Sequence, residues 1–200
     1  MLFRSILGIH INYDRERRLL ILSQSLYIDQ VLSELGLQDC SSVATPLDPN
    51  VSLDYNDEED HEAQSDQVTY AYSSLIGKLL RLATIARPDI SFTSNRLAQF
   101  TRNPKTRHWT AIKRVFQYLK GTRDVGLWYE GKDKGMEEMK IYCNADWASQ
   151  ADQKSMSGYV ITLAGGAIAW SSKKQTAIAL STAEAEYVTA THVTKQVLWQ

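Results

Sequence analysis

The sequence predicts an α+β protein in which a mainly helical segment precedes a small mixed sheet with one packed helix. Apolar residues recur at helical spacing over 75–85 and 104–120. From residue 125 the pattern changes to short apolar runs separated by turn residues, and a helical segment begins near Ser181. Consecutive strands followed by a helix are typical of the α+β class.

The first 36 residues predict a hairpin followed by a helix. Residues 6–13 and 19–22 are the expected strands, joined by a polar turn. Ser25 is the expected N-cap of a helix that ends at Gly36. The apolar face of this helix is expected to comprise Leu26, Ile28, Val31, Leu32 and Leu35.

A loop over 39–69 separates this part from three predicted helices. The first helix must end before Pro88, and Asp89 is the expected N-cap of the second. The third spans 104–120, with Asn103 as N-cap and Gly121 as the residue after its end. Four side chains share its apolar face: Trp109, Ile112, Phe116 and Leu119.

Four strands are expected over 125–129, 139–143, 158–163 and 167–170. Ala164-Gly165-Gly166 separates the last two and predicts a hairpin. The tryptophans at 109, 128, 147 and 170 are expected in the core.

The composition excludes several classes of protein. Hydrophobic residues make up 44% of the 200, which is too many for a disordered chain. Cys40 and Cys143 match no metal-ligand spacing, so we expect neither a disulfide framework nor a zinc site. We find no membrane span and no signal peptide, and expect an intracellular protein, cytoplasmic or nuclear.

The net charge of −1 is a cancellation between two neighbouring segments. Residues 48–70 hold eight acids and no Lys or Arg, whereas 71–128 hold eleven bases and two acids. The acidic run predicts a solvated linker. Clustered bases are typical of phosphate binding, although a solvated helix face explains them equally well.

The candidate phosphate-binding side chains lie on two segments. Four belong to the predicted 104–120 helix, namely Arg107, Lys113, Arg114 and Lys120. Lys173 and Lys174 form a second candidate, with a plain solvated turn as the alternative. The histidines at 10, 61, 108 and 192 are scattered and predict no metal site; for His108 we expect a surface or capping position.

Polar groups at the end of the 139–143 strand suggest a second kind of site. Asp146 follows that strand closely, and Glu184 lies in the first turn of the last helix. Such carboxylates can share Mg²⁺, which prefers oxygen ligands. The alternative is purely structural, because Ser181 and Glu184 have the spacing of a capping box.

Several motifs resemble the ribonuclease H domain of copia-type retrotransposon Pol polyproteins. They are Ile141-Tyr-Cys-Asn-Ala-Asp-Trp-Ala148, Lys154-Ser-Met-Ser-Gly-Tyr-Val160, Gly165-Gly-Ala-Ile-Ala-Trp-Ser-Ser-Lys-Lys-Gln175 and Ala179-Leu-Ser-Thr-Ala-Glu-Ala-Glu-Tyr187. Upstream motifs resemble the end of the same polyprotein's reverse transcriptase. They include Tyr72-Ser-Ser-Leu-Ile-Gly-Lys-Leu79, Arg87-Pro-Asp-Ile90 and His108-Trp-Thr-Ala-Ile-Lys-Arg-Val115.

The resemblance implies two parts. Residues 1–124, with the acidic linker 48–70, would be the C-terminal thumb or connection segment of the reverse transcriptase. Residues 125–200 would be the first part of a ribonuclease H-like domain. The polymerase motif Tyr-x-Asp-Asp does not occur, so polymerase activity is not expected.

The ribonuclease H half of the family cleaves the RNA strand of RNA–DNA hybrids with Mg²⁺ held by four acids. In this sequence the first acid position is Asn144, Asp146 is a supporting acid, and Glu184 aligns with the family glutamate. The later two acids would follow Gln200. The resemblance therefore implies a nuclease fold whose catalytic and metal-binding set is reduced to Glu184, Asp146 and the degenerate Asn144, and we expect no hydrolysis.

Two functions remain open at this stage. One is the inherited handling of RNA–DNA hybrids, together with the rest of the Pol polyprotein. The alternative is a non-catalytic nucleic-acid-binding or assembly fragment that uses the basic 71–128 segment. The family fold also pairs the first strand of the domain, 139–144, with a strand beyond this sequence, so we expect that strand to be an unprotected, aggregation-prone edge.

Overall fold

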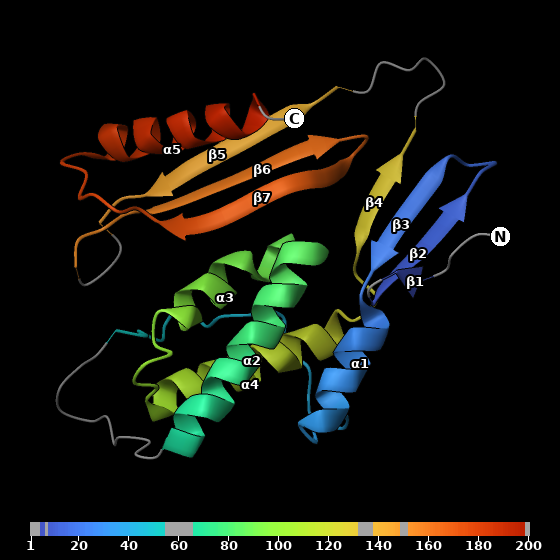
Figure 1. Cartoon of the computed structure of the whole chain (residues 1–200), viewed down its shortest axis with the longest axis horizontal. Helices are drawn as coiled ribbons and strands as arrows, with labels where there is room; N and C mark the ends of the chain where they lie inside the picture. Colours follow the sequence, from blue (N-terminus) through green and yellow to red (C-terminus); the bar gives the residue numbers. More distant parts are fainter. Residues whose placement is uncertain (1–4, 7, 55–65, 132–137, 149–151, 199–200) are drawn as a thin grey trace. The chain divides into compact units, whose positions relative to one another are not determined.

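The computed structural model describes residues 5–6, 8–54, 66–131, 138–148 and 152–198 (Figure 1). Contacts divide the chain into two units, of which the first comprises residues 1–15 and 20–127 and the second 16–19 and 128–200. Each unit is described by itself. Helices dominate the first, and a sheet with one helix forms most of the second, which makes the chain mixed α/β and compatible with the predicted α+β class.

A four-stranded sheet of order β1-β2-β3-β4 contains the predicted N-terminal hairpin. Its strands are β1 Ser5–Ile6, β2 Ile9–Asp14, β3 Leu19–Ser23 and β4 Leu127–Glu130. The expected single strand over 6–13 is interrupted at Gly8, whose φ of +81° turns the chain back so that Ser5 pairs with His10.

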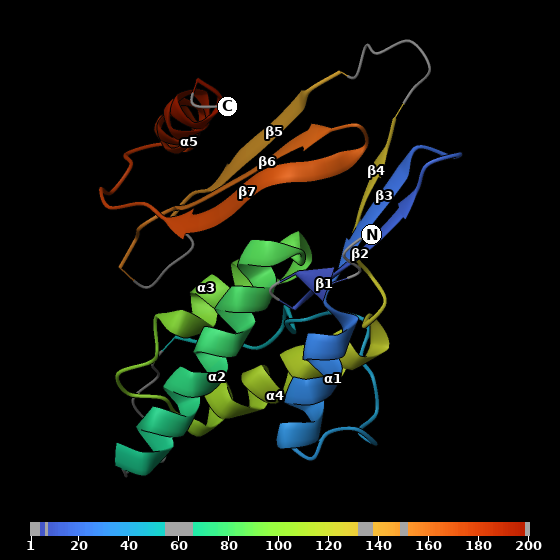
Figure 2. The same cartoon turned by 45° about the vertical axis from the view of Figure 1, so that its right-hand side comes forward.

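The helices of the first unit enclose one hydrophobic core (Figure 2). They are α1 Ser25–Glu34, α2 Asp66–Ile85, the short 3₁₀ helix η1 Pro88–Ile90, α3 Ser91–Ala98 and α4 Thr106–Gly121. The predicted apolar faces are largely confirmed: Ile28, Val31 and Leu32 of α1 and Ile112, Phe116 and Leu119 of α4 are buried. Leu26 is exposed, contrary to the prediction.

The predicted helix caps are mostly wrong, by one or two residues. Gln24, not Ser25, precedes α1. Asp89 lies inside η1, because its carboxylate pairs with Arg87 instead of capping α3. Lys105 replaces Asn103 as the residue before α4, since the ring of His108 accepts the Lys105 N–H.

Gly121 and Gly36 show two reasons for glycine at a helix end. Gly36 has a φ of +64° and terminates α1 as predicted. Gly121 is the last residue of α4 rather than the residue after it. A Cβ there would lie 2.9 Å from the Cβ of Ser42, so close approach of another segment requires the glycine.

A fully buried arginine joins η1 to the end of α4. The Arg87 guanidinium donates to both carboxylate oxygens of Asp89, from Nε at 2.9 Å and from Nη2 at 2.7 Å, and to the carbonyl oxygen of Thr122 at 2.9 Å. Tyr118 donates a further bond to Asp89 at 2.9 Å. Burial raises the pKa of the Asp89 carboxyl, but the hydrogen bonds and charge of Arg87, with the Tyr118 bond, outweigh it and hold that pKa below its ordinary value.

The second unit contains a three-stranded sheet covered on one face by a helix (Figure 1). Its elements are β5 Lys140–Asp146, β6 Met156–Leu163, β7 Gly166–Lys174 and α5 Thr182–Val197. Both strand pairings are antiparallel, so the sheet predicted as mixed is antiparallel over its described strands. The predicted hairpin is confirmed: Ala164 and Gly165, with φ of 53° and 82°, connect β6 to β7.

Within the described residues, β5 lies at an edge of this sheet and pairs only with β6. Its side chains are mostly exposed, Ile141 and Tyr142 among them. The prediction of an exposed edge agrees with this arrangement, and its aggregation stays a prediction.

The tryptophans are less buried than predicted. Trp128 and Trp147 are 55% and 44% exposed, so their predicted place in the core is wrong. The Trp147 indole N–H donates to the carbonyl oxygen of Ala179 at 2.9 Å, so the polar group of this partly exposed ring has a partner. Among the described helices, none combines the length and the apolar character needed to cross a lipid bilayer.

Replacing Arg87 with Ala is expected to lower the free energy of unfolding of the first unit by about 3–5 kcal/mol, because it leaves the partly buried Asp89 carboxylate without its partner. Urea unfolding followed by far-UV circular dichroism measures this. The matched control is Arg123→Ala: Arg123 pairs with Asp29 at 2.9 Å on the surface, and its loss should cost about 0–1 kcal/mol. Equal losses in the two variants would contradict the role of the Arg87 junction.

The pH dependence provides a check on the same contact. A carboxyl whose pKa is lowered on folding stabilises the protein above its ordinary pKa of 3.8 and loses that contribution as the pH falls through the lower folded value. The difference in the free energy of unfolding between wild type and Arg87→Ala should therefore become smaller as the pH falls below 3.8.

Candidate nucleic-acid interface

Residues 40–54, called here the 40–54 segment, lie along α4 in the opposite chain direction. Lys120 at the end of the helix contacts the Cys40 carbonyl, Arg114 contacts Thr45, and Arg107 near the start contacts Asp54. The helix that carries most of the predicted phosphate-binding residues is therefore occupied on one side by the chain's own linker.

His108 fixes the 40–54 segment at its C-terminal end. Its Nδ1 accepts the Lys105 N–H at 2.8 Å, so Nε2 carries the proton and donates to the Leu53 carbonyl oxygen at 2.8 Å. The ring is fully buried and stacks on Phe100 at 4.0 Å between centroids. His108 is the capping residue that the sequence predicted, but it is not at the surface.

Two arginines bind the adjacent Asp54. Arg96 Nη2 lies 2.5 Å from a carboxylate oxygen of Asp54 and Arg107 Nη1 donates to its backbone oxygen at 2.9 Å. The Arg96 guanidinium also lies over the Phe100 ring, 5.2 Å from its centroid. The acidic pattern predicted a solvated linker here. For Asp54 that prediction is wrong, because two arginines bind this residue.

Arg114, about two turns further along α4, also contacts the 40–54 segment. Arg114 donates to the Thr45 hydroxyl at 3.0 Å and lies 3.9 Å from Asp48. The rest of the acidic run, residues 55–65, lies outside the described residues, except that Asp66 begins α2.

These contacts separate the predicted phosphate-binding residues of α4 into two groups. Arg107, Arg114 and Lys120 contact the 40–54 segment, whereas Lys113 is exposed. Contact of any of the four with nucleic acid stays a prediction.

In the second unit, a buried polar cluster joins α5 to the sheet. The Gln175 amide donates to the Ser157 hydroxyl and to the Ala185 carbonyl oxygen, each at 2.9 Å. The hydroxyls of Ser157 and Thr189 lie 2.6 Å apart. The same helix buries Ala185, Thr189 and Val193, which are spaced four residues apart and form the stripe that faces the sheet.

Glu184 serves as a helix-capping residue. The Ser181 hydroxyl accepts the Glu184 N–H at 3.2 Å, and the Glu184 carboxylate accepts the Leu180 N–H at 2.7 Å. The structural alternative derived from the sequence therefore has a geometric basis, although the carboxylate reaches residue 180 rather than the Ser181 N–H of an ideal capping box.

Glu184 and Glu186 lie on opposite sides of the buried stripe, because each is one residue, or about 100°, from Ala185. Glu186 lines a cavity of about 310 Å³ together with Asn144 and Cys143 of β5. Sequence reasoning missed Glu186. The helical position of Ala185 was the signal that could have separated the two glutamates.

The residues present do not fit the magnesium site that the resemblance implies. Asn144 and Asp146 share a strand face, but Glu184 lines a different cavity from the one that contains Asn144. Within the described part of the chain, no three His, Cys, Asp or Glu side chains gather to hold a metal ion. The metal roles of Glu184 and Asp146 stay predictions.

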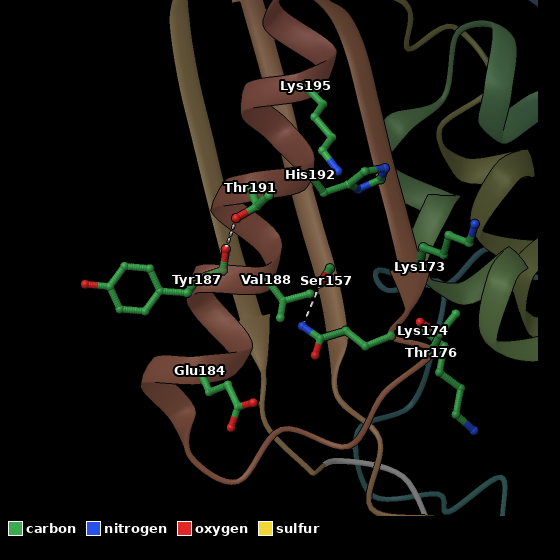
Figure 3. Close-up of a pocket in the computed structure, with 11 residues that line it drawn as sticks. Ser157, Lys173, Lys174, Thr176, Glu184, Tyr187, Val188, Thr191, His192 and Lys195 are labelled. Carbon is green, nitrogen blue, oxygen red and sulfur yellow. Dashed lines mark hydrogen bonds between the residues drawn. The ribbon is translucent and has the colours of Figure 1, made fainter.

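A second cavity of about 450 Å³, called here the α5–β7 groove, lies between α5 and the end of β7 (Figure 3). It contains the predicted Lys173 and Lys174, and also His192 and Lys195, neither of which the sequence predicted to bind phosphate. Lys174 pairs with Asp152 at 2.9 Å, and this hydrogen bond lowers the pKa of the Asp152 carboxyl.

Comparison with known proteins finds relatives over nearly the whole chain. The retrovirus-related Pol polyprotein of transposon TNT 1-94 from Nicotiana tabacum is 37% identical over 198 residues, 98% of this chain and 15% of that protein. The Pol polyprotein of transposon RE2 from Arabidopsis thaliana is 34% identical over 181 residues, which are 89% of this chain and 12% of that protein. The secreted RxLR effector protein 161 of Plasmopara viticola is 38% identical over 129 residues, 64% of this chain and 89% of that protein. No family model and no solved structure matches.

The chain therefore belongs to the retrovirus-related Pol polyproteins of copia-type retrotransposons, as the motifs predicted. It spans only 12–15% of the length of the Pol polyproteins it matches.

Replacing Thr189 with Val is expected to lower the free energy of unfolding of the second unit by about 1–3 kcal/mol, because it removes a buried partner of Ser157 and Gln175. Thr191→Val is the matched control: Thr191 is exposed on the same helix, and the change should stay within about 0.5 kcal/mol. Hydrogen exchange of the α5 amides measures both. Equal protection in the two variants would show that the polar cluster does not hold the helix.

Proposed function

We propose that this part of a Pol polyprotein binds RNA–DNA hybrids without hydrolysing the RNA strand. The observation that carries the proposal is Asn144 on β5, at the position where the resemblance implies the first metal-binding aspartate. An amide supplies one neutral oxygen in place of a carboxylate, and Mg²⁺ sites in proteins depend on carboxylate charge.

The arrangement around Asn144 supports the same conclusion. Among the described residues, the one carboxylate that lines its cavity is that of Glu186, while the Glu184 carboxylate accepts the backbone N–H of Leu180 before α5. The cavity between β5 and α5 therefore offers a set of metal ligands that does not fit two divalent cations. We derive no hydrolytic step for these residues.

We propose that the second unit makes most of the contacts with the hybrid. Lys173 is exposed there, whereas Arg107, Arg114 and Lys120 of α4 are engaged with the 40–54 segment. Association with the rest of the Pol polyprotein, and an intracellular location where such hybrids form, belong to the same proposal.

The alternative is a binding or assembly role for the basic 71–128 segment. Two of its exposed bases, Arg102 and Lys113, favour this alternative. Charge reversal at these two positions tests it, because neither is among the α4 residues that contact the 40–54 segment.

The proposal predicts hybrid binding with a steep inverse salt dependence and no RNA cleavage in Mg²⁺ or Mn²⁺. Fluorescence anisotropy with a labelled hybrid measures binding, and gel analysis of the RNA strand measures cleavage. The control for contaminating nuclease is the pair Glu184→Ala and Glu186→Ala: cleavage that either substitution abolishes would refute the proposal. Absence of binding at about 50 mM salt would refute it equally.

A further inference from the structure

The α5–β7 groove joins a polar floor to an open, partly apolar wall. Ser157 and the buried Gln175 form the floor, and their hydrogen bond fixes the Gln175 amide. Val188 and Thr191 of α5 line one wall. Figure 3 shows Lys195 and His192 near one end and Glu184 near the other, with Val188 between them.

Basic side chains line the groove from its middle to the Lys195 end. Lys195 and His192 are three residues apart on α5 and so lie on the same side of the helix one turn apart. Lys173 of β7 adds a second ammonium group. In the described residues, neither Lys173 nor Lys195 forms an ion pair, whereas Lys174 is paired with Asp152.

Negative charge in the groove is already engaged. The only lining carboxylate among the described residues is Glu184, and it accepts the Leu180 N–H. Glu184 and Lys195 are eleven residues apart, which corresponds to about 16 Å along the helix. A strand of nucleic acid would therefore need several nucleotides to span the distance from Lys195 to Glu184.

We propose that the α5–β7 groove binds the sugar–phosphate backbone of one strand of the hybrid, with phosphates at Lys173, Lys195 and His192. The proposal rests on the hybrid binding proposed above and identifies its site. Lysine ammonium groups bind phosphate as point charges, and Val188 offers apolar surface to a sugar. Contacts of this kind read no bases, so binding is independent of sequence.

The test compares the double variant Lys173→Gln/Lys195→Gln with wild type by anisotropy between about 50 and 200 mM salt. Loss of two phosphate contacts should weaken binding by about tenfold at the lower salt concentration and reduce the slope of log affinity against log salt by about 1.5. His192→Gln should add a smaller loss. Lys140→Gln is the matched control, because Lys140 is an exposed lysine of the same unit outside the groove. The Lys140→Gln variant should bind the hybrid with the affinity of wild type.

The outcomes separate the site from the function. Wild-type affinity in the double variant, with a wild type that binds hybrid, overturns the groove and leaves the proposed function intact. Failure of wild type itself to bind overturns the proposed function and the groove together. An equal loss in Lys140→Gln also overturns the groove, because it shows that net charge alone governs binding. Thermal unfolding of each variant verifies that the second unit is folded.

Discussion

The first unit depends on the attachment of residues 53–54 to α3 and α4. Leu53 is buried in the core. His108 binds the Leu53 carbonyl oxygen, Arg107 binds the Asp54 carbonyl oxygen, and Arg96 binds the Asp54 carboxylate. The attachment combines apolar burial with charge-assisted hydrogen bonds, and it holds the 40–54 segment against α3 and α4. In the described part of the acidic run, Asp54 pairs with Arg96 and Asp48 lies near Arg114, so these opposite charges contribute to folding. The same attachment reduces the cationic surface that α4 offers to a phosphate backbone.

The second unit is organised by the stripe of Ala185, Thr189 and Val193. Because this stripe faces the sheet, the two flanks of α5 face different surroundings: Glu186 lies with Asn144 of β5, and Glu184 lies in the α5–β7 groove. The proposed function assigns the groove to backbone binding and leaves the β5 side with an amide in place of a carboxylate. Under this proposal, the binding groove and the position of the lost carboxylate lie on opposite sides of α5, so loss of hydrolysis need not impair binding.

The sequence predicted the elements well where local rules decide the structure. Apolar spacing identified α4, the Ala164-Gly165-Gly166 turn identified the β6–β7 hairpin, and the motifs identified the family. The errors in the helix caps arose from tertiary contacts. Asp89 pairs with Arg87 instead of capping α3, and the His108 ring displaces the cap of α4. The 40–54 segment also engages Arg107 and Arg114, whose contact with phosphate stays a prediction. Glu186 was missed because the resemblance placed the family glutamate at Glu184, two residues earlier in the same motif. No spacing rule within the sequence shows that residues 54 and 96 meet.

The central claim is that the arginines of α4 stabilise the first unit rather than bind nucleic acid. The double variant Arg107→Gln/Arg114→Gln tests it most directly when unfolding and hybrid binding are measured on the same protein. The account predicts a loss of about 1–3 kcal/mol in the free energy of unfolding of the first unit, with an unchanged salt slope for hybrid binding. Unchanged stability together with a reduced salt slope would contradict it.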